Sequence, residues 1–156
     1  MELKTPQSLN AEHEELHAQL ARAAKAGGAT GEAAKTVAKA IHPHFLKEEE
    51  YALPPLGLLP ILAKGKSLPE MVEAVKMAER LKAELSHMIQ EHKEIVAALK
   101  DLKEAAKREG KDEFVHFAEK LTLHAQTEEE VLYPASILVG EYLKLMHAKK
   151  SWPVIR

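Results

Sequence analysis

The chain has 156 residues, of which 46% are hydrophobic and 29% are charged, and its formal net charge is −2 at pH 7. This length and balance predict one globular domain that can bury a core. The small, evenly spread charge argues against a nucleic-acid partner, and the absence of cysteine excludes disulfides and thiolate metal sites.

We expect no targeting signal at the start of the chain. Its first ten residues, MELKTPQSLN, lack the apolar stretch of a signal peptide, and no apolar run approaches the roughly 18 residues that suggest a membrane span. We therefore expect a cytoplasmic protein without a membrane segment.

Two helices are predicted in the first third of the chain. The first runs over residues 8–26 and ends at Gly27-Gly28, and the second runs over 30–51 with Thr30 as its N-cap. Pro43 predicts a kink just before His44. Each helix has a stripe of residues spaced by three and four, which predicts one buried face. The stripes are Leu9, His13, Leu16, Leu20 and Ala23 in the first helix, and Val37, Ile41, His44, Glu48 and Tyr51 in the second.

The middle of the chain combines an apolar connection with a long helix. Residues 52–66, with three prolines and two glycines, are predicted to be irregular and to pack over one end of a bundle or onto a partner. A helix start at residues 67–70 opens an uninterrupted segment to Arg108, which Gly110 ends. The sequence leaves open whether the part before Leu81 overhangs or packs separately. The bundle-facing stripe is Leu81, Leu85, Met88, His92, Ile95, Leu99, Leu102 and Ala106.

A fourth long helix is predicted to start near Asp112. Its stripe is followed by Pro134 and by a possible short helix over residues 135–149, and strand patterns are absent. The predicted fold is therefore all-α, an up-down four-helix bundle with a short C-terminal helix. The stripe of the fourth helix consists of Phe114, Phe117, Leu121, His124, Glu128 and Val131.

The chain repeats itself at an offset of about 80 residues. HFLKEEEYALP, which starts at His44, resembles HAQTEEEVLYP, which starts at His124, and EHEEL at residues 12–16 resembles EHKEI at residues 91–95. Two ordered matches at nearly one offset indicate an internal pseudo-twofold duplication, with halves 8–66 and 81–148. The duplication predicts two nearly equivalent half-sites.

Four histidines and two glutamates lie on stripes that should face one core. Buried carboxylates are costly unless they are paired or bind a metal. One interpretation is a polar layer of hydrogen-bonded histidines and glutamates in a purely structural bundle. The other is a nitrogen and oxygen site for first-row metals, in which two metals share both glutamates. A ferritin-like pattern, Glu-x-x-His, also fits Glu84 and His87, but these two residues fall on the solvent side of their helix.

The order His13, His44-x-x-x-Glu48, His92, His124-x-x-x-Glu128 resembles the hemerythrin-like (HHE cation-binding) family over nearly the whole chain, as a single domain over residues 1–156. The resemblance implies two iron ions, oxo- or hydroxo-bridged, with His13, His44, His92 and His124 as terminal ligands and Glu48 and Glu128 as bridges. It implies a protein that binds or senses dioxygen, peroxide or nitric oxide. The alternatives are an enzyme that disproportionates peroxide or reduces nitric oxide, and an iron-handling or delivery protein.

The chain departs from the oxygen-carrying hemerythrins at Met88. Those proteins have a histidine at this position, so the departure argues against reversible oxygen carriage, and Met88 is predicted to be core packing. Tyr51 lies on the line of His44 and Glu48 and is predicted to act on the site from outside the metal ligands, although ordinary packing is the alternative. The sequence decides neither the small ligand nor the oligomeric state.

Overall fold

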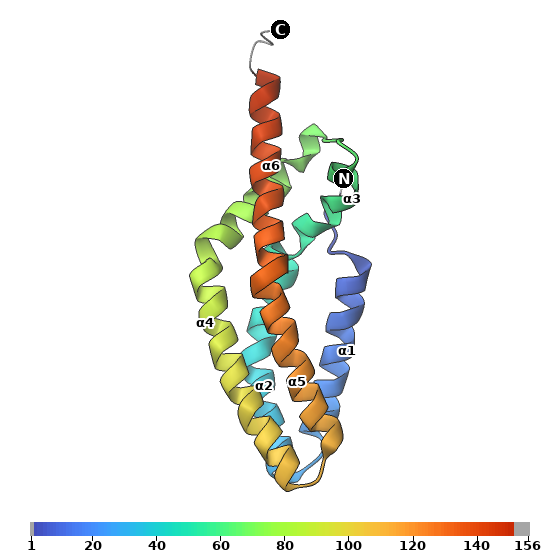
Figure 1. The fold of residues 1–156 in the computed structure, drawn as a ribbon, viewed down its shortest axis with the longest axis vertical. Helices are drawn as coiled ribbons and strands as arrows, with labels where there is room; N and C mark the ends of the chain where they lie inside the picture. Colours follow the sequence, from blue (N-terminus) through green and yellow to red (C-terminus); the bar gives the residue numbers. More distant parts are fainter. Residues whose placement is uncertain (1, 152–156) are drawn as a thin grey trace.

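The computed structural model describes residues 2–151, and the side chains of residues 2–148. Helices α1, α2, α4 and α5 run up and down alongside one another, and α6 continues from α5 beyond the bundle (Figure 1). This confirms the all-α, four-helix prediction. The α-helices are α1 (Gln7–Ala24), α2 (Gly28–Lys47), α3 (Leu59–Ala63), α4 (Val72–Arg108), α5 (Asp112–Thr127) and α6 (Tyr133–Ser151).

The turns after α1 and after α4 lie at the same end of the bundle, and hydrogen bonds to Glu109 connect them. Gly27 and Gly110 have φ values of +73° and +69°, which favour glycine, and they end α1 and α4 as predicted. Thr30 is not the N-cap that we predicted, because α2 already begins at Gly28. Instead, Thr30 is buried, and its N–H and hydroxyl donate to Glu109 Oε1 at 2.8 and 2.5 Å.

A π-helical turn follows each His-x-x-x-Glu segment. In η1 (Glu48–Ala52) the N–H of Leu53 donates to the Glu48 carbonyl, and in η4 (Glu128–Leu132) the N–H of Tyr133 donates to the Glu128 carbonyl. Proline comes next in both places and supplies no N–H, so the regular ladder cannot continue unchanged there.

The π-turn overturns one predicted position of the fourth helix. A π-turn holds one more residue than an α-turn, so it rotates everything after it around the helix axis. Val131, expected on the buried stripe, is 55% exposed, whereas Tyr133 is fully buried. The helix is not interrupted at Pro134 either, since α6 begins at Tyr133 and runs on directly from η4.

The apolar connection and the start of α4 pack together against α6. The connection consists of η1, η2 (Pro54–Leu58) and α3, and a short 3-10 turn, η3 (Pro69–Met71), precedes α4. Gly140 of α6 lies so close to Ala78 of α4 that a Cβ at residue 140 would come within 2.4 Å of the Ala78 Cβ. The connection therefore covers one end of the bundle, and the start of α4 packs there instead of overhanging. This second core contains Leu58, Leu62, Met71, Ala74, Val139 and Leu143.

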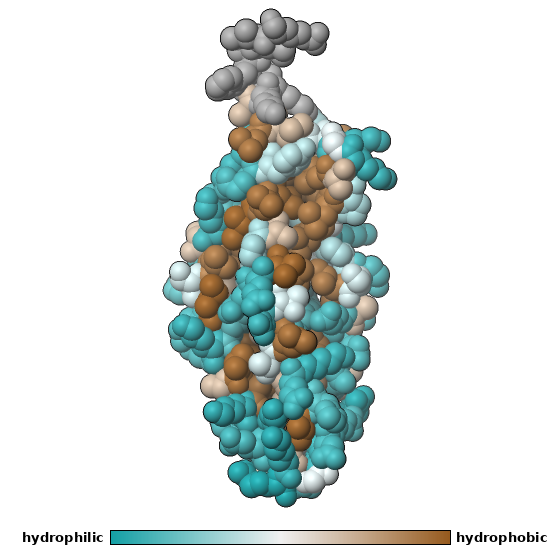
Figure 2. Space-filling view, in the orientation of Figure 1, coloured by the Kyte–Doolittle hydropathy of each residue, from teal (hydrophilic) through white to brown (hydrophobic). Residues whose placement is uncertain are grey.

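An apolar groove remains on the surface between α3 and α6. It has a volume of about 400 Å³, and its lining includes Leu59, Leu138, Tyr142 and Leu145. Hydrophobic residues gather over this upper part of the molecule (Figure 2). Among the described helices, none combines the length and apolarity needed to cross a membrane.

Candidate metal centre

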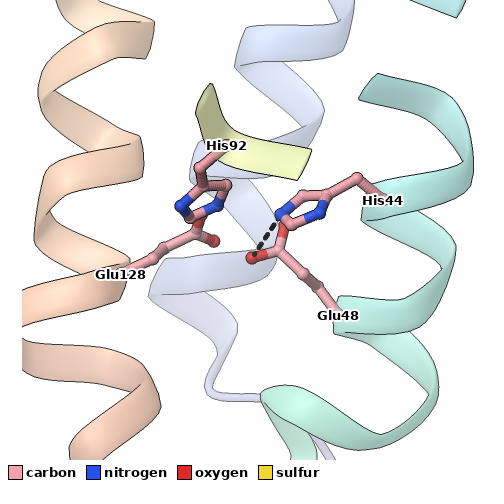
Figure 3. A group of neighbouring side chains, drawn as sticks. All are labelled: His44, Glu48, His92 and Glu128. Atoms are coloured by element: carbon pink, nitrogen blue, oxygen red, sulfur yellow. Dashed lines mark ion pairs between the residues drawn. The ribbon is translucent and has the colours of Figure 1, made fainter. Parts of the chain in front are cut away.

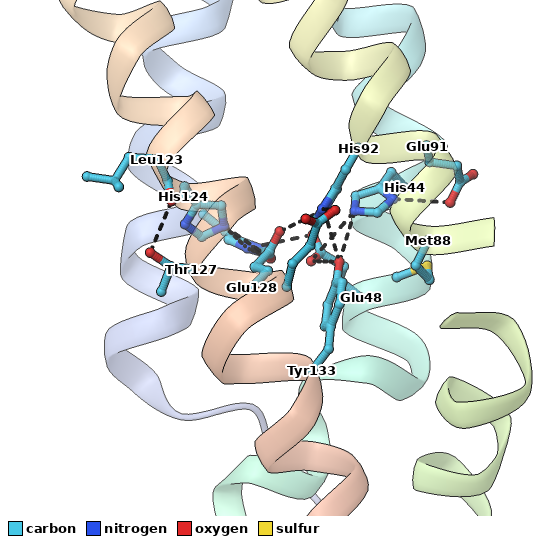
Figure 4. Close-up of polar contacts among 12 residues, drawn as sticks. His44, Glu48, Met88, Glu91, His92, Leu123, His124, Thr127, Glu128 and Tyr133 are labelled. Carbon is cyan, nitrogen blue, oxygen red and sulfur yellow. Dashed lines mark hydrogen bonds and ion pairs between the residues drawn. The ribbon is translucent and has the colours of Figure 1, made fainter. Parts of the chain in front are cut away.

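Five of the six side chains singled out in the sequence converge in the middle of the bundle (Figure 4), and the sixth, His13, joins them with its Nε2 3.2 Å from His124 Nε2. They come from all four bundle helices and from the first residue of each π-turn. All six are buried, and the most exposed of them, His124, has an exposed fraction of only 6%. The six are His13, His44, Glu48, His92, His124 and Glu128.

One group of four donors forms around His44 and His92, with Glu48 and Glu128 between them (Figure 3). His92 Nε2 lies 3.1 Å from Glu128 Oε1, and His44 Nε2 lies 3.8 Å from Glu48 Oε2. One ligand atom from each of the four residues lies within 4.8 Å of the others. This is a spacing that one metal ion can span.

A second group forms around His13 and His124. Their Nε2 atoms are 3.2 Å apart, and they lie 3.6 and 3.1 Å from Glu128 Oε2. The other oxygen of Glu48, Oε1, lies 3.9 Å from His13 Nε2. Each carboxylate therefore faces both groups, one oxygen to each, which is the arrangement of a bridging ligand.

Two carboxylate oxygens in this cluster lack a hydrogen bond. Glu48 Oε1 and Glu128 Oε2 are buried and have no hydrogen-bond partner, and their contacts are with imidazole nitrogens, at 3.9 Å for Glu48 Oε1 and at 3.1 and 3.6 Å for Glu128 Oε2. Burial, and then the charge of Glu128, raise the pKa of Glu48 well above its usual value. A cation between the carboxylates would compensate the cost of burying their negative charge. The donors therefore fit a metal site with nitrogen and oxygen ligands.

Outer carboxylates orient three of the four histidines. His44 Nδ1 lies 3.1 Å from Glu91 Oε1, and His92 Nδ1 lies 3.1 Å from Glu129 Oε1. His124 Nδ1 pairs with Glu12. Such contacts fix the ring so that Nε2 faces the centre, as in many metal sites.

The helix stripes did not indicate these outer carboxylates. A helical wheel places Glu129 away from His124 on its own helix, but Glu129 reaches His92 on the neighbouring helix. The repeat did contain a usable signal, because Glu12 directly precedes His13 and Glu91 directly precedes the equivalent residue, His92. Each of them pairs with the His-x-x-x-Glu histidine of the neighbouring helix.

The tyrosine nearest the centre is Tyr133. Its hydroxyl donates to Glu48 Oε2 at 2.7 Å and lies 3.0 Å from His44 Nε2 and 3.2 Å from His92 Nε2. Burial, and then the charge of Glu48, raise the pKa of Tyr133. Tyr51, which the stripe favoured, directs its hydroxyl to Met88 Sδ at 3.7 Å and not to Glu48. No signal in a regular helical pattern points to Tyr133, because the π-turn brings it inward.

The other histidines lie outside the cluster. His17 stacks on His42 with ring centroids 5.5 Å apart, and burial lowers the pKa of His17. His87 is exposed and pairs with Glu84 of its own helix at 3.2 Å. The Glu84 and His87 pair of the ferritin-like pattern therefore lies on the surface of the bundle.

Comparison with known families agrees with this geometry. The family model described as the hemerythrin HHE cation binding domain matches residues 5–136, a range that contains all six clustered side chains. No curated protein and no solved structure matches the chain significantly.

Proposed function

We propose that this protein, which belongs to the hemerythrin HHE cation-binding family, is a non-haem di-iron protein that binds or senses a small oxidant. In this proposal His44 and His92 hold one iron ion, and His13 and His124 hold the other. Glu48 and Glu128 bridge the two ions. The bound iron supplies the affinity for dioxygen, peroxide or nitric oxide, and the chain supplies the position and the enclosure.

The single observation that carries the proposal is the pair of buried oxygens without hydrogen bonds, Glu48 Oε1 and Glu128 Oε2. A structural polar layer would be expected to satisfy both of them, because a buried polar atom without a hydrogen bond costs free energy. Here they face the Nε2 atoms of histidines whose other nitrogens are mostly held by outer carboxylates. A metal centre of this kind requires imidazole nitrogens whose lone pairs point towards shared carboxylates, as the histidine Nε2 atoms do around Glu48 and Glu128.

The enclosure restricts what can reach the site. The donors are almost wholly buried, and a surface groove of about 640 Å³ between α1 and α5 has Glu12 and His124 among its lining residues. Because the donors are this deeply buried, we expect a ligand of two or three heavy atoms to reach them more readily than a larger substrate. This supports a small oxidant as the external ligand.

Aerobic iron reconstitution tests the proposal. We expect two iron ions per chain in the unaltered protein, a large loss in His44→Ala and in His124→Ala, and no loss in His87→Ala, whose side chain is exposed. Well under one iron per chain in the unaltered protein would contradict the di-iron function.

Adding peroxide to the reconstituted protein then separates binding from turnover. Sustained gas evolution identifies an enzyme, and a stable spectral change without gas identifies a binding or sensing protein. If the protein shows neither gas evolution nor a stable spectral change but releases its iron to an acceptor, it is an iron-delivery protein.

A further inference from the structure

The hydroxyl of Tyr133 lies where a further ligand of the His44 and His92 group would lie. In an octahedral shell with metal–ligand distances of about 2.1 Å, neighbouring donors are about 3.0 Å apart, which is the square root of two times that distance. The Tyr133 oxygen lies 3.0 Å from His44 Nε2, 3.2 Å from His92 Nε2 and 2.7 Å from Glu48 Oε2. All three distances lie within about 0.3 Å of such an edge.

The position of Tyr133 is set by backbone structure and not by a flexible side chain. Tyr133 directly follows η4, is fully buried, and its ring lies 5.5 Å from the His92 ring in a stacked arrangement. The shift of the π-turn turns this residue inward, while Val131 turns outward.

The duplication does not explain a hydroxyl at this place. The counterpart of Tyr133 at the offset of 80 residues is Leu53, which follows η1 in the same way and is also buried. A leucine fills the same position in the first half without donor chemistry. The hydroxyl is therefore a feature of one group only.

We propose that Tyr133 is a ligand of the metal ion held by His44 and His92; the inference rests on the proposed di-iron function. Ligation forms one iron–oxygen bond and breaks the phenolic O–H bond, and the proton leaves to solvent, so no oxidant or reductant is needed. A bound ferric ion would supply the positive charge that a phenolate ligand needs, as metals do for other acidic ligands.

This assignment makes the two metal positions unequal. The His44 and His92 position has donors from Glu48, Glu128 and Tyr133 besides its two histidines. Among the described residues, the donors of the His13 and His124 position are its two histidines and the carboxylate oxygens. The position that keeps more places for an external ligand is the one whose His124 lines the groove between α1 and α5.

Resonance Raman spectroscopy of the iron-loaded protein tests the assignment. The protein has three tyrosines, Tyr51, Tyr133 and Tyr142. We expect tyrosinate ring modes, enhanced in a visible phenolate-to-iron band, that shift when the chain is grown with ring-deuterated tyrosine. Tyr133→Phe should lose these modes completely and still contain iron. The matched variant Tyr51→Phe, whose hydroxyl contacts Met88, should keep them.

A second variant keeps the test decisive if Tyr133→Phe fails to fold. In Tyr51→Phe/Tyr142→Phe, Tyr133 is the only tyrosine left, so modes that persist there identify it without altering it. An iron-loaded protein without deuterium-sensitive modes, or modes that survive Tyr133→Phe, would overturn the assignment and leave the di-iron function standing. A chain that takes up no iron would overturn both.

Discussion

The two halves of the chain keep the same inner donors but surround them differently. His44 and His124 occupy equivalent places, and each has its Nδ1 paired with a glutamate of a neighbouring helix, Glu91 and Glu12 respectively. The surroundings of the other two histidines of the cluster, His13 and His92, differ more. His92 pairs with Glu129, whereas His13, alone among the four in the described chain, has no carboxylate at Nδ1 and stacks on a phenylalanine ring 4.5 Å away.

The difference shows where a duplicated site is free to diverge. In the proposed di-iron centre the inner residues repeat because a shared pair of bridging carboxylates needs donors on both sides. The next layer repeats only in part, and at one place it changes from Leu53 to Tyr133. The sequence predicted two nearly equivalent half-sites, and the surroundings of the donors instead lead us to expect different affinities.

The largest effect should come from Glu128, because it lies within 3.1 Å of a histidine in each group. Glu128→Ala removes the carboxylate nearest to both positions, and we expect less than one iron per chain after reconstitution. Glu48→Ala should retain more iron, since the nearest histidine nitrogens to Glu48 are 3.8 and 3.9 Å away. Metal analysis of both variants checks this, and equal losses would argue that the two bridges are interchangeable.

Replacing the outer carboxylates should affect one position at a time. Glu91→Gln weakens the support of His44, and Glu12→Gln weakens that of His124, so each should lower metal affinity about 10- to 100-fold at its own position. A competitive chelator titration resolves the two binding steps, with Glu84→Gln as a matched control on the surface of α4. If either variant weakens both steps equally, the two positions are coupled through the bridges more than the contacts suggest.

The sequence indicated which inner side chains lie together. The helix stripes and the offset of 80 residues brought out His44, Glu48, His124 and Glu128, and all four lie in the cluster. The stripes indicate this because regular helices place residues three and four apart on one face, and the repeat marks each position twice. That these residues bind metal stays a prediction.

Two kinds of information were missing from the stripes. A helical wheel describes one helix, so it cannot show that Glu129 reaches across to His92. It also assumes 3.6 residues per turn, and the π-turn before Tyr133 breaks that assumption. The wheel therefore favoured Tyr51 as the tyrosine near the cluster, whereas the hydroxyl that contacts Glu48 belongs to Tyr133. Local departures from helical regularity have to be seen in the structure.

The metal-free protein should gain stability when one bridge loses its charge. At neutral pH the buried Glu48 must either stay charged beside Glu128 or take up a proton, and both cost free energy that an amide avoids. Glu48→Gln should therefore raise the free energy of unfolding of the metal-free protein by about 1–3 kcal/mol while it lowers iron binding. Urea denaturation measures the gain. Glu49→Gln, an exposed neighbour, should change it by less than about 0.5 kcal/mol.

Met88 should prove to be packing for one half of the site and not a donor. It is fully buried and packs with Tyr51, Leu81 and Tyr133, and a thioether is a poor ligand for ferric iron. Met88→Leu should leave iron content and the visible spectrum unchanged and cost less than about 1.5 kcal/mol in unfolding free energy. A changed spectrum would show that Met88 acts on the centre, directly or through Tyr133.

The smallest expected effect concerns the far end of the bundle, where Glu109 of the second half contacts Thr30 of the first half. Glu109 accepts hydrogen bonds from the N–H and hydroxyl of Thr30, and these bonds lower the pKa of Glu109 from 4.5 to about 2. Because the folded pKa lies below the unfolded one, the contribution to stability is complete above about pH 5 and is lost as the pH falls from 4.5 towards 2. Urea midpoints of the metal-free protein should therefore be higher than those of Glu109→Gln at neutral pH and should converge with them in acid. A difference that stays constant down to pH 3, or an equal effect in the exposed control Glu104→Gln, would show that this carboxylate does not join the two halves.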